Sequence, residues 1–407
     1  MKISVVGLGF VGLVTSVVLS RAGNNVICID TDESKINRLN KGELYIYEPK
    51  LDSLFTDQKS KMRFETDYSD VKGSDLTFVC VPTPTVNGRS DLSFVRDAVT
   101  RTGKVDRETI IVIKSTVLPG TAKSLSSAIS NRIISNPEFL REGSAVDDTL
   151  HPDRIVIGGR DNAALDKVEG AWRFCGSPIV RTTNENAELI KYASNSFLAA
   201  KISFINEISD LCERIPGTDV EIIAKGMGLD HRIGREFLRA GLGFGGSCFP
   251  KDTRAIAEYA NKIGTRLSIV ESAIDVNERR VERGVKIIEN TMGSLNGKRI
   301  CLLGLSFKEN TNDLRESRAL DLARALRERG ALVYAYDPVI KDIEGIGTLR
   351  SAEECDGMDC VVVSSEWKEF EDLPLFKRAN NVIDLKRIVN TATNPSVKSI
   401  GVGYAKN

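Results

Sequence analysis

Strand-like and helix-like patterns of apolar residues alternate along the first 160 residues. The runs KISVVG at 2–7 and NVICID at 25–30 are typical of buried strands, and the segment 10–23 between them is typical of a helix. A second helix is expected over 32–42, ended by the glycine at its last position. Three further strands and one helix start are expected, at Leu76–Val81, Thr109–Lys114, Arg154–Gly158 and near Asp91. This alternation predicts a parallel sheet with helices on both faces.

The pattern changes in the middle of the chain. Long helical periodicities cover 184–214 and 268–292, and a glycine-rich loop lies between them. Strand and helix patterns alternate again from Lys298 onward. The sequence therefore predicts an α/β fold with two Rossmann-like domains joined by a long central helix and a helical spine, divided at 1–190, 191–295 and 296–407. Such a spine often forms a dimer interface, and an intrachain helical bundle is the alternative.

Composition excludes several classes of protein. The 407 residues contain 56 Lys and Arg against 56 Asp and Glu, so the formal net charge is zero. Nucleic-acid and acidic-membrane binding both need a cationic excess, which argues against either partner. Two histidines and eight cysteines without a CxxC pair give no metal-site pattern, so we expect no metal. Most cysteines are expected to be buried thiols of a reduced, cytoplasmic protein.

The uncharged stretch 3–20 raises the question of a signal peptide or a membrane span. It contains three glycines and several hydroxyl residues, lacks a small-residue cleavage pattern and continues directly into another strand. We therefore interpret it as part of the first strand and helix rather than as a targeting segment.

A glycine fingerprint follows the first strand. Gly7, Gly9 and Gly12 form GxGxxG at the start of a helix, and Asp30 ends the next strand 18 positions after Gly12. The glycines permit a tight turn, close approach of a pyrophosphate and close packing of helix on strand. A carboxylate at Asp30 would accept from ribose hydroxyls and repel a 2′-phosphate, which favours NAD over NADP. The alternative is a Rossmann unit that binds no nucleotide.

A second candidate site is the segment GLGFGGSCFPKD. Four glycines precede Cys248, and Lys251 and Asp252 follow it. Glycines would let a ligand approach the backbone closely, and a thiol near a helix start and a lysine should have a lowered pKa and act as a nucleophile. An inert loop cysteine is the alternative from these features alone.

Two further pairs could assist such a cysteine. Glu138 and Glu142 lie four apart in NPEFLREG and would share a face if this segment is helical. Lys191 and Asn195 lie four apart on the long helix, where an ammonium and an amide could stabilise an oxyanion. Solvated helix faces are the alternative for both pairs.

The chain resembles the UDP-glucose/GDP-mannose dehydrogenase family, and within it the short bacterial UDP-glucose 6-dehydrogenase type, over nearly its full length. The resemblance rests on GLGFVGL, VPTPT, IKSTVLPGT, SNPEFLREG, HPDRIVIG, the Lys191/Asn195 helix, GFGGSCFPKD, LSFKENTNDLRES and DLKR. It implies an N-terminal NAD-binding domain, a central helical domain with the cysteine loop, a C-terminal UDP-binding domain and a homodimer. It also implies oxidation of UDP-glucose at C6 to UDP-glucuronate with two NAD⁺, through a thiohemiacetal and a thioester on Cys248.

The resemblance assigns residues to three roles. Catalytic positions are Cys248, Lys191, Asn195, Asp252, Glu138 and Thr116. Cofactor positions are Gly7, Gly9, Phe10, Val11, Gly12, Asp30, Lys35, Thr83, Thr116, Glu142, Lys251 and Arg315. Substrate positions are Glu138, Phe139, Leu140, Glu142, Lys191, Asn195, Arg232, Arg239, Gly245, Phe307, Lys308 and Arg387. For Phe307 the alternative is a core residue.

Three rival functions remain open on the sequence. One is a related enzyme acting on UDP-N-acetylmannosamine or GDP-mannose, although Ser247 and the Lys251-Asp252 pair resemble the glucose branch more closely. Another is a one-step β-hydroxyacid dehydrogenase, which would need neither a nucleophilic cysteine nor a second α/β domain. The third is an NAD-binding regulator without catalysis.

Overall fold

The structure, a computed structural model, describes residues 1–86 and 89–404 and divides the chain into two compact units. Unit 1 is Met1–Ser194 and unit 2 is Asn195–Asn407. Helix α8 (Asn184–Cys212) begins in unit 1 and ends in unit 2. The predicted three-part division stays a prediction. Unit 2 contains the part of α8 from Asn195 onward, all of α11 and the C-terminal sheet.

Unit 1 is built on an eight-stranded sheet with the order β10-β9-β8-β7-β4-β1-β2-β3. All neighbouring strands are parallel except β8 and β9. The strands are β1 (Lys2–Val6), β2 (Asn25–Ile29), β3 (Met62–Glu65), β4 (Leu76–Val79), β7 (Ile110–Ile113), β8 (Ile133–Ser135), β9 (Ile155–Gly158) and β10 (Ile179–Thr182). A separate hairpin pairs β5 (Thr85–Val86) with β6 (Arg89–Ser90). The order β3-β2-β1-β4-β7-β8 is that of a doubly wound dinucleotide-binding sheet.

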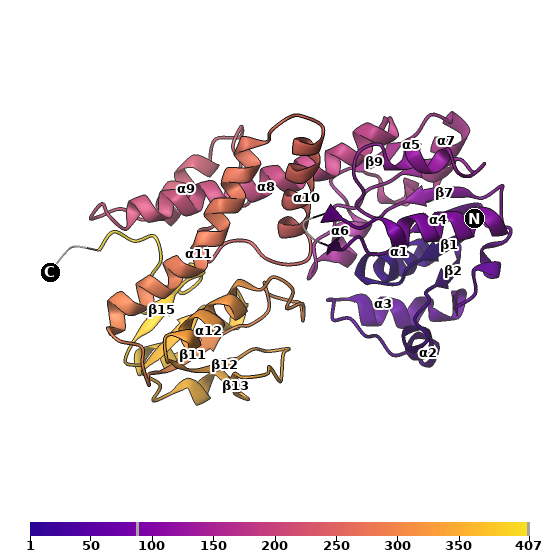
Figure 1. Cartoon of the computed structure of the whole chain (residues 1–407). Helices are drawn as coiled ribbons and strands as arrows, with labels where there is room; N and C mark the ends of the chain where they lie inside the picture. Colours follow the sequence, from indigo (N-terminus) through magenta and orange to yellow (C-terminus); the bar gives the residue numbers. More distant parts are fainter. Residues whose placement is uncertain (87–88, 405–407) are drawn as a thin grey trace. The chain divides into compact units, whose positions relative to one another are not determined.

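The helices of unit 1 cover both faces of this sheet (Figure 1). They are α1 (Phe10–Arg21), α2 (Glu33–Lys41), α3 (Leu51–Gln58), α4 (Ser93–Val105), α5 (Thr121–Ser126), α6 (Ala145–Leu150) and α7 (Asn162–Trp172), with 3₁₀ turns η1 (Lys59–Lys61), η2 (Tyr68–Val71) and η3 (Arg173–Cys175). Helix α2 begins and ends as expected: the Asp32 carboxylate accepts from the N–H groups of Ser34 and Lys35, and Gly42 ends the helix with a left-handed φ of 89°.

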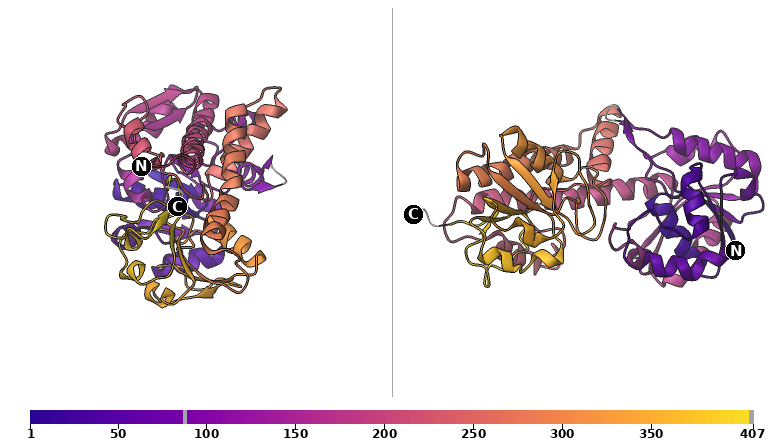
Figure 2. Two further views of the ribbon diagram at one scale, coloured as in Figure 1. Left: turned by 90° about the vertical axis from the view of Figure 1, so that its left-hand side faces the viewer. Right: turned by 90° about the horizontal axis from the view of Figure 1, so that it is seen from below.

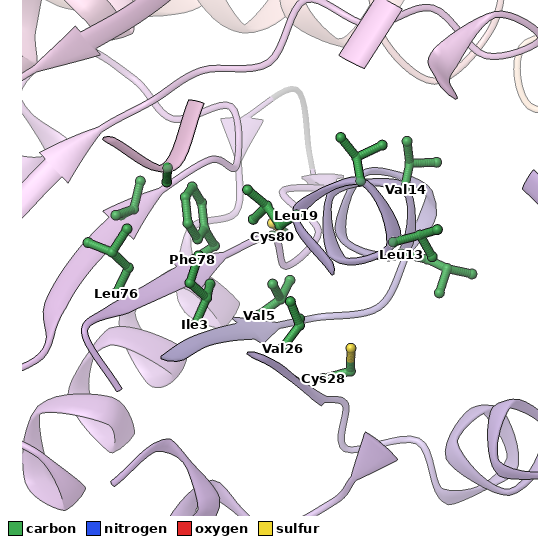
Figure 3. Packing of buried hydrophobic residues seen from close by; sticks show 14 of the residues in the cluster. Ile3, Val5, Leu13, Val14, Leu19, Val26, Cys28, Leu76, Phe78 and Cys80 are labelled. Atoms are coloured by element: carbon green, nitrogen blue, oxygen red, sulfur yellow. The ribbon is translucent and has the colours of Figure 1, made fainter. Parts of the chain in front are cut away.

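Alternate residues of the central strand β1 enter two separate cores. Ile3 and Val5 pack with α1 residues such as Leu13 and Leu19, as Figure 3 shows, whereas Val6 belongs to the cluster on the opposite face. Strand side chains alternate between faces, so each face of the sheet needs its own apolar cover. This accounts for the continuous apolar runs in the sequence.

Unit 2 contains a six-stranded parallel sheet with the order β13-β12-β11-β14-β15-β16. Its strands are β11 (Arg299–Leu303), β12 (Leu332–Tyr336), β13 (Gly347–Thr348), β14 (Cys360–Val363), β15 (Val382–Asp384) and β16 (Lys398–Ser399). Its helices after α8 are α9 (Val220–Gly228), α10 (Phe249–Lys262), α11 (Ser268–Met292) and α12 (Arg318–Glu328), with 3₁₀ turns η4 (Ala352–Cys355), η5 (Lys368–Phe370) and η6 (Pro374–Lys377). The strands and their flanking helices can be followed in Figure 2.

The predicted fold class is confirmed. The six strands β3-β2-β1-β4-β7-β8 of unit 1 and the six strands of unit 2 follow the same doubly wound order, and the predicted long helices are present as α8 and α11. With 29 residues, α8 is about 44 Å long at 1.5 Å per residue. Among the described residues, no helix is both long and apolar enough to cross a membrane.

Two cysteines depart from the expected reduced state. Cys301 on β11 and Cys355 in η4 form a disulfide within unit 2, and both are fully buried. Cys28, Cys80, Cys212 and Cys360 are buried thiols, as expected, whereas Cys175 and Cys248 are partly exposed. Sequence spacing could not indicate this pair, because its members lie 54 residues apart and meet only in the packed core between β11 and η4.

Candidate active site

The turn between β1 and α1 has the geometry of a dinucleotide-binding turn. Gly7 has a φ of +88°, and a Cβ there would lie 2.9 Å from the main chain of Cys80. A Cβ on Gly12 would lie 1.8 Å from the carbonyl oxygen of Gly7, whereas one on Gly9 would meet nothing within 4 Å. The first glycine thus permits the turn, the third permits close packing, and the second leaves space beside the backbone for a pyrophosphate.

The N-terminus of α1 follows directly. Phe10 and Val11 form its first positions, and no acidic residue lies in its first turn. The first N–H groups of a helix lack acceptors within the helix and carry the positive end of its dipole. The start of α1 therefore provides the donors and the potential that bind a phosphate.

Asp30 lies at the carboxyl end of β2, beside this turn. Its Oδ2 accepts from the Leu8 N–H at 2.7 Å, and the Nζ of Lys35 lies 3.6 Å from the same oxygen. Tyr45, which was assigned no role from the sequence, donates its hydroxyl to the Leu8 carbonyl oxygen. The predicted cofactor residues Asp30 and Lys35 thus lie together at the turn, and Tyr45 supports its backbone.

A small cavity lies beyond the carboxyl ends of β7 and β8. It is lined by Ile113, Ser115, Thr116, Val117, Ser135, Pro137, Glu188 and Lys191. The structure thus brings together two predicted residues, Thr116 and Lys191. Ligand sites of open α/β sheets lie outside the carboxyl ends of the strands, so this cavity has the expected position.

Lys191 forms a buried ion pair next to this cavity. Its Nζ lies 2.8 Å from Oε1 of Glu138, and the two side chains are 4% and 7% exposed. The other carboxylate oxygen of Glu138 is buried and has no hydrogen-bond partner within the described part of the chain. Because an unpartnered buried oxygen is costly, this atom is available to a water or a substrate hydroxyl.

Glu188, one helical turn before Lys191 on α8, is a site residue that the sequence reasoning missed. Its carboxylate accepts from the N–H groups of Gly120 and Ala122 at 2.6 and 2.9 Å and from the Ser135 hydroxyl at 3.3 Å. Burial raises the pKa of Glu188 to about 7, and the hydrogen bonds to Ala122 and Gly120 oppose that rise. Glu188 thereby holds the backbone that follows Thr116.

The segment NPEFLREG is a loop and a turn rather than a helix. The shared helical face that would have paired Glu138 with Glu142 is therefore absent, because the chain leaves β8 in an extended path. The Arg154 guanidinium lies 3.8 Å from the ring centroid of Phe139, and Leu140 packs against the core. Glu142 is buried at the end of this loop, and Thr83 is buried elsewhere in unit 1.

Glu48 is another residue that was assigned no role from the sequence. Its carboxylate accepts from the N–H groups of Gly143 and Ala145, both at 2.7 Å. It therefore holds the backbone directly after Glu142. A single acidic residue carries no local signal for this contact, which spans 95 and 97 residues of sequence.

In unit 2, Cys248 stands at the N-cap of α10, and Pro250 lies in the first turn of that helix. The Cys248 carbonyl oxygen accepts from the Asp252 N–H, and the Ser247 hydroxyl lies 3.5 Å from the Cys248 sulfur. The thiol is partly exposed. The expected helix start after the cysteine is confirmed, so the sulfur lies near the positive end of a helix dipole.

Asp252 joins two other predicted residues in unit 2. Its Oδ2 accepts from Asn195 Nδ2 at 2.7 Å, and its Oδ1 lies 2.5 Å from Lys251 Nζ. Asp252 is 1% exposed and Asn195 5%. Both oxygens of this carboxylate are therefore engaged, and Asn195 is held in one orientation on α8, four residues after Lys191.

Two of the glycines before Cys248 are required for a different reason from the one predicted. The sequence predicted open space for a ligand at these positions. In the structure, a Cβ on Gly245 would lie 2.2 Å from the Glu316 carbonyl oxygen, and one on Gly246 would lie 2.6 Å from the ring of Phe307. These glycines are thus required by close packing of the chain on itself. Lys308 lies over the Phe307 ring, 5.7 Å from its centroid.

The predicted cationic substrate residues differ in their surroundings. Arg387 is buried. It donates to Asp219, the N-cap of α9, at 2.7 Å and to Glu221 in the first turn of α9 at 3.0 Å. Arg232 pairs with Asp230 at the surface, Arg315 pairs with Asp313, and Arg239 is exposed. Within the described ranges, no group of three or more His, Cys, Asp or Glu side chains is arranged to hold a metal ion.

Comparison with known proteins identifies the family. The chain is 42% identical to UDP-glucose 6-dehydrogenase YwqF of Bacillus subtilis (strain 168) over 397 residues, covering 92% of this chain and 90% of that protein. The chain belongs to the UDP-glucose/GDP-mannose dehydrogenase family. Its residues 1–174 match the family's NAD binding domain, 185–279 its central domain and 301–391 its UDP binding domain.

Solved structures of family members are similar over the whole chain. A UDP-glucose dehydrogenase from the hyperthermophilic archaeon Pyrobaculum islandicum superposes with a TM-score of 0.93 at 36% identity, covering 99% of this chain and 98% of that chain. A UDP-D-ManNAc dehydrogenase from Pyrococcus horikoshii superposes with a TM-score of 0.90 at 25% identity, covering all of both chains. The family resemblance drawn from the sequence motifs is therefore confirmed.

Proposed function

We propose that this protein oxidises the C6 alcohol of UDP-glucose to the carboxylate of UDP-glucuronate, in two NAD-dependent steps on one enzyme. The observation that carries the proposal is the partly exposed Cys248 at the start of α10, in a chain 42% identical to a UDP-glucose 6-dehydrogenase. A one-step alcohol dehydrogenase needs no nucleophile, whereas a four-electron oxidation gains from one that retains the aldehyde.

The residues of unit 1 fit NAD. The open space at Gly9 admits a pyrophosphate, the start of α1 supplies N–H donors, and the buried Asp30 carboxylate is available to ribose hydroxyls. Bound NAD supplies the hydride acceptor for each oxidation. The chain's own residues bind and orient the substrate and hold the protons and the covalent link.

The covalent steps take place on Cys248. Its thiolate adds to the C6 aldehyde, forming a C–S bond and a thiohemiacetal whose oxygen takes the carbonyl electrons. Loss of the C6 hydride then leaves a thioester. Water attacks the thioester carbonyl, the C–S bond breaks, and the carboxylate and the free thiolate are released. The covalent link keeps the reactive aldehyde bound between the two oxidations.

We assign the remaining catalytic roles by this chemistry. Lys191 and Asn195 donate to the C6 oxygen when it carries negative charge, and Asn195 is oriented for this by Asp252. Glu138, with one partnered and one unpartnered oxygen, acts with the hydrolytic water as general base. Asp252 assists proton transfer, and Thr116 orients the reacting groups from the cavity wall.

The UDP moiety is assigned to unit 2. Arg387, Arg239, Arg232 and Lys308 provide the cations that a diphosphate requires, and Phe307 offers a ring face. Arg387 reaches a diphosphate only in competition with its two carboxylate partners, Asp219 and Glu221. This arrangement reconciles a zero net charge with an anionic substrate, because the positive charge is local.

Substrate and stoichiometry are tested together. Purified protein is incubated with NAD⁺ and UDP-glucose, UDP-N-acetylmannosamine or GDP-mannose, and NADH is counted against acidic product. We expect turnover to require UDP-glucose and to give two NADH per UDP-glucuronate. Preference for another sugar nucleotide would contradict the substrate assignment, and one NADH per product would favour the one-step β-hydroxyacid class.

We also propose that the protein forms a homodimer through α8 in the cytoplasm. Phe197, Phe204 and Leu211 repeat every seven residues along this helix and are 67%, 48% and 53% exposed. Two helical turns contain about 7.2 residues, so the three side chains form one apolar stripe on the helix. A second copy of the stripe would cover it, and sedimentation velocity of the wild type and of Phe204→Glu tests this.

A further inference from the structure

The backbone leading to Cys248 is bound from helix α11 by a buried amide. Asn277 accepts from the Phe244 N–H through Oδ1 at 2.7 Å and donates through Nδ2 to the Phe244 carbonyl oxygen at 3.0 Å. Asn277 is 2% exposed and Phe244 5%. One side chain thus satisfies both main-chain polar groups of the same buried residue, and its loss would leave the Phe244 N–H without an acceptor.

The amide also explains the glycine before Phe244. A Cβ on Gly243 would lie 2.2 Å from Asn277 Oδ1, and Gly243 has a φ of +96°. Any other residue would push the amide away and strain the backbone. Gly243 and Asn277 therefore depend on each other.

The next helical turn of α11 binds the start of the same loop. Arg280, 1% exposed, donates from Nε to the Gly241 carbonyl oxygen at 3.0 Å and from Nη1 to Asp210 at 2.6 Å. Asn206 on α8 accepts from the Gly241 N–H at 2.8 Å. The loop is therefore bound at both polar groups of Gly241 and at both polar groups of Phe244.

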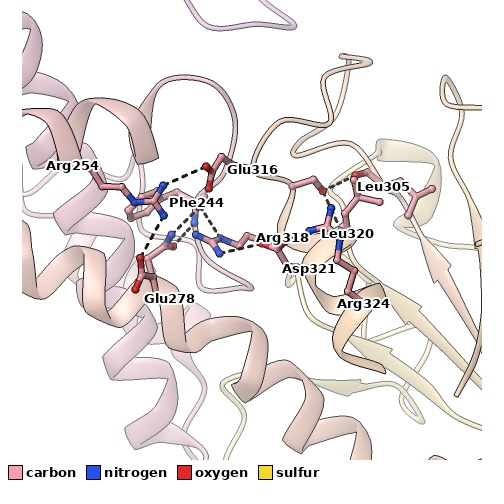
Figure 4. A network of polar contacts seen from close by, with 11 residues as sticks. Phe244, Arg254, Glu278, Leu305, Glu316, Arg318, Leu320, Asp321 and Arg324 are labelled. Atoms are coloured by element: carbon pink, nitrogen blue, oxygen red, sulfur yellow. Dashed lines mark hydrogen bonds and ion pairs between the residues drawn. The ribbon is translucent and has the colours of Figure 1, made fainter. Parts of the chain in front are cut away.

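The chain after the cysteine is tied to the same helix. Arg254 on α10 lies 3.4 Å from Glu278 of α11 and 3.3 Å from Glu316, and Arg318 donates to the Phe244 carbonyl oxygen at 3.2 Å. Figure 4 shows Arg254 between Glu316 and Glu278, and Arg318 donating to Phe244. The adjacent residues Asn277 and Glu278 thus bind the backbone four residues before Cys248 and a side chain six residues after it.

We infer that Asn277 is a positioning residue for Cys248, acting through the Phe244 backbone to fix the loop that ends at the thiol. The inference rests on the proposed function for its catalytic consequence, but the orientation of the sulfur can be measured without any substrate. A misplacement of about 1 Å at a reacting group can cost on the order of 100-fold in rate. Movement of the loop after loss of Asn277 should therefore reduce the reaction at Cys248 while leaving NAD binding by unit 1 intact.

The test compares Asn277→Ala with a matched control, Asn394→Ala. Asn394 is also 2% exposed in unit 2, and its amide donates to Asp372 and to the Asn390 carbonyl oxygen rather than to the loop. Both variants lose a buried amide, so both should melt at a lower temperature. Asn277→Asp keeps the acceptor for the Phe244 N–H, loses the donor and serves as the conservative variant if the alanine variant does not fold.

Two readouts separate positioning from stability. The first is the rate of Cys248 alkylation by iodoacetamide across pH, located by peptide mapping. The second is kcat against KM for NAD⁺ and UDP-glucose. Asn277→Ala should shift the alkylation profile and lower kcat by about 10- to 100-fold with KM for NAD⁺ nearly unchanged. Asn277→Asp should be intermediate, and Asn394→Ala should match the wild type in both readouts.

A lowered melting temperature in Asn277→Ala with wild-type alkylation and kcat would overturn the inference and leave Asn277 a stabilising residue only. If the wild type oxidises no UDP-glucose, the proposed function fails separately. The alkylation profiles then still decide whether Asn277 positions the thiol.

Discussion

The buried carboxylate of Glu188 makes unit 1 less stable as the pH rises. Its pKa is raised to about 7 from an ordinary 4.5, chiefly by burial. Between these values the folded protein keeps a proton that the unfolded chain has lost, so stability falls as pH increases. A difference of about 2.5 pKa units at 1.36 kcal/mol per unit amounts to about 3 kcal/mol, lost between roughly pH 4.5 and pH 8.

Glu188→Gln removes this titration and nearly preserves the shape of the side chain. The protein contains two tryptophans, of which Trp172 is buried in unit 1 and Trp367 in unit 2. In a Trp367→Phe background, urea unfolding followed by tryptophan fluorescence therefore reports on unit 1. The free energy of unfolding of the Glu188 protein, minus that of the variant, should fall by about 2.5 kcal/mol from pH 5 to pH 8. A difference that stays flat or rises over this range would refute the reasoning.

Three further predictions concern other parts of the chain. Gly12→Ala should lower the melting temperature of unit 1, because its Cβ would lie 1.8 Å from the Gly7 carbonyl oxygen, whereas Gly9→Ala should melt normally and weaken NAD⁺ binding in a fluorescence titration. Under denaturing conditions without reductant, six of the eight cysteines should react with a thiol reagent. The double variant Cys301→Ala/Cys355→Ala should lose about 4 kcal/mol in free energy of unfolding, measured with urea, because the disulfide closes a loop of 54 residues. Lys191→Met should leave Glu138 buried without its cation, which should destabilise unit 1 by about 3–5 kcal/mol in thermal melts and lower kcat by orders of magnitude in steady-state kinetics. A stable, active variant would exclude both the stabilising and the catalytic role of Lys191.

The sequence predicted the central strands and the long helices, because buried strands and periodic helices leave strong apolar patterns. It missed β8, which has three residues, and β10, an edge strand whose side chains are half-buried or exposed. Such segments carry too little periodic signal to separate them from loops.

The candidate site was predicted unevenly for a similar reason. The glycine fingerprint and the start of α10 after Cys248 are local features and follow from neighbouring residues. The contacts of Arg387 with Asp219, of Asn277 with Phe244 and of Cys301 with Cys355 join residues far apart in the chain. No local pattern specifies such pairs, which depend on how the strands and helices pack. Glu188 was missed because a single glutamate on a long helix resembles a solvated one until its partners are known.

The most direct test of covalent catalysis is mass spectrometry of the protein quenched shortly after mixing with NAD⁺ and UDP-glucose. We predict a sugar-nucleotide adduct that peptide mapping locates on Cys248 and that Cys248→Ser lacks, together with loss of turnover in that variant by orders of magnitude and retained NAD⁺ binding. Near-normal turnover of Cys248→Ser, with no adduct on the wild-type protein, would contradict the account.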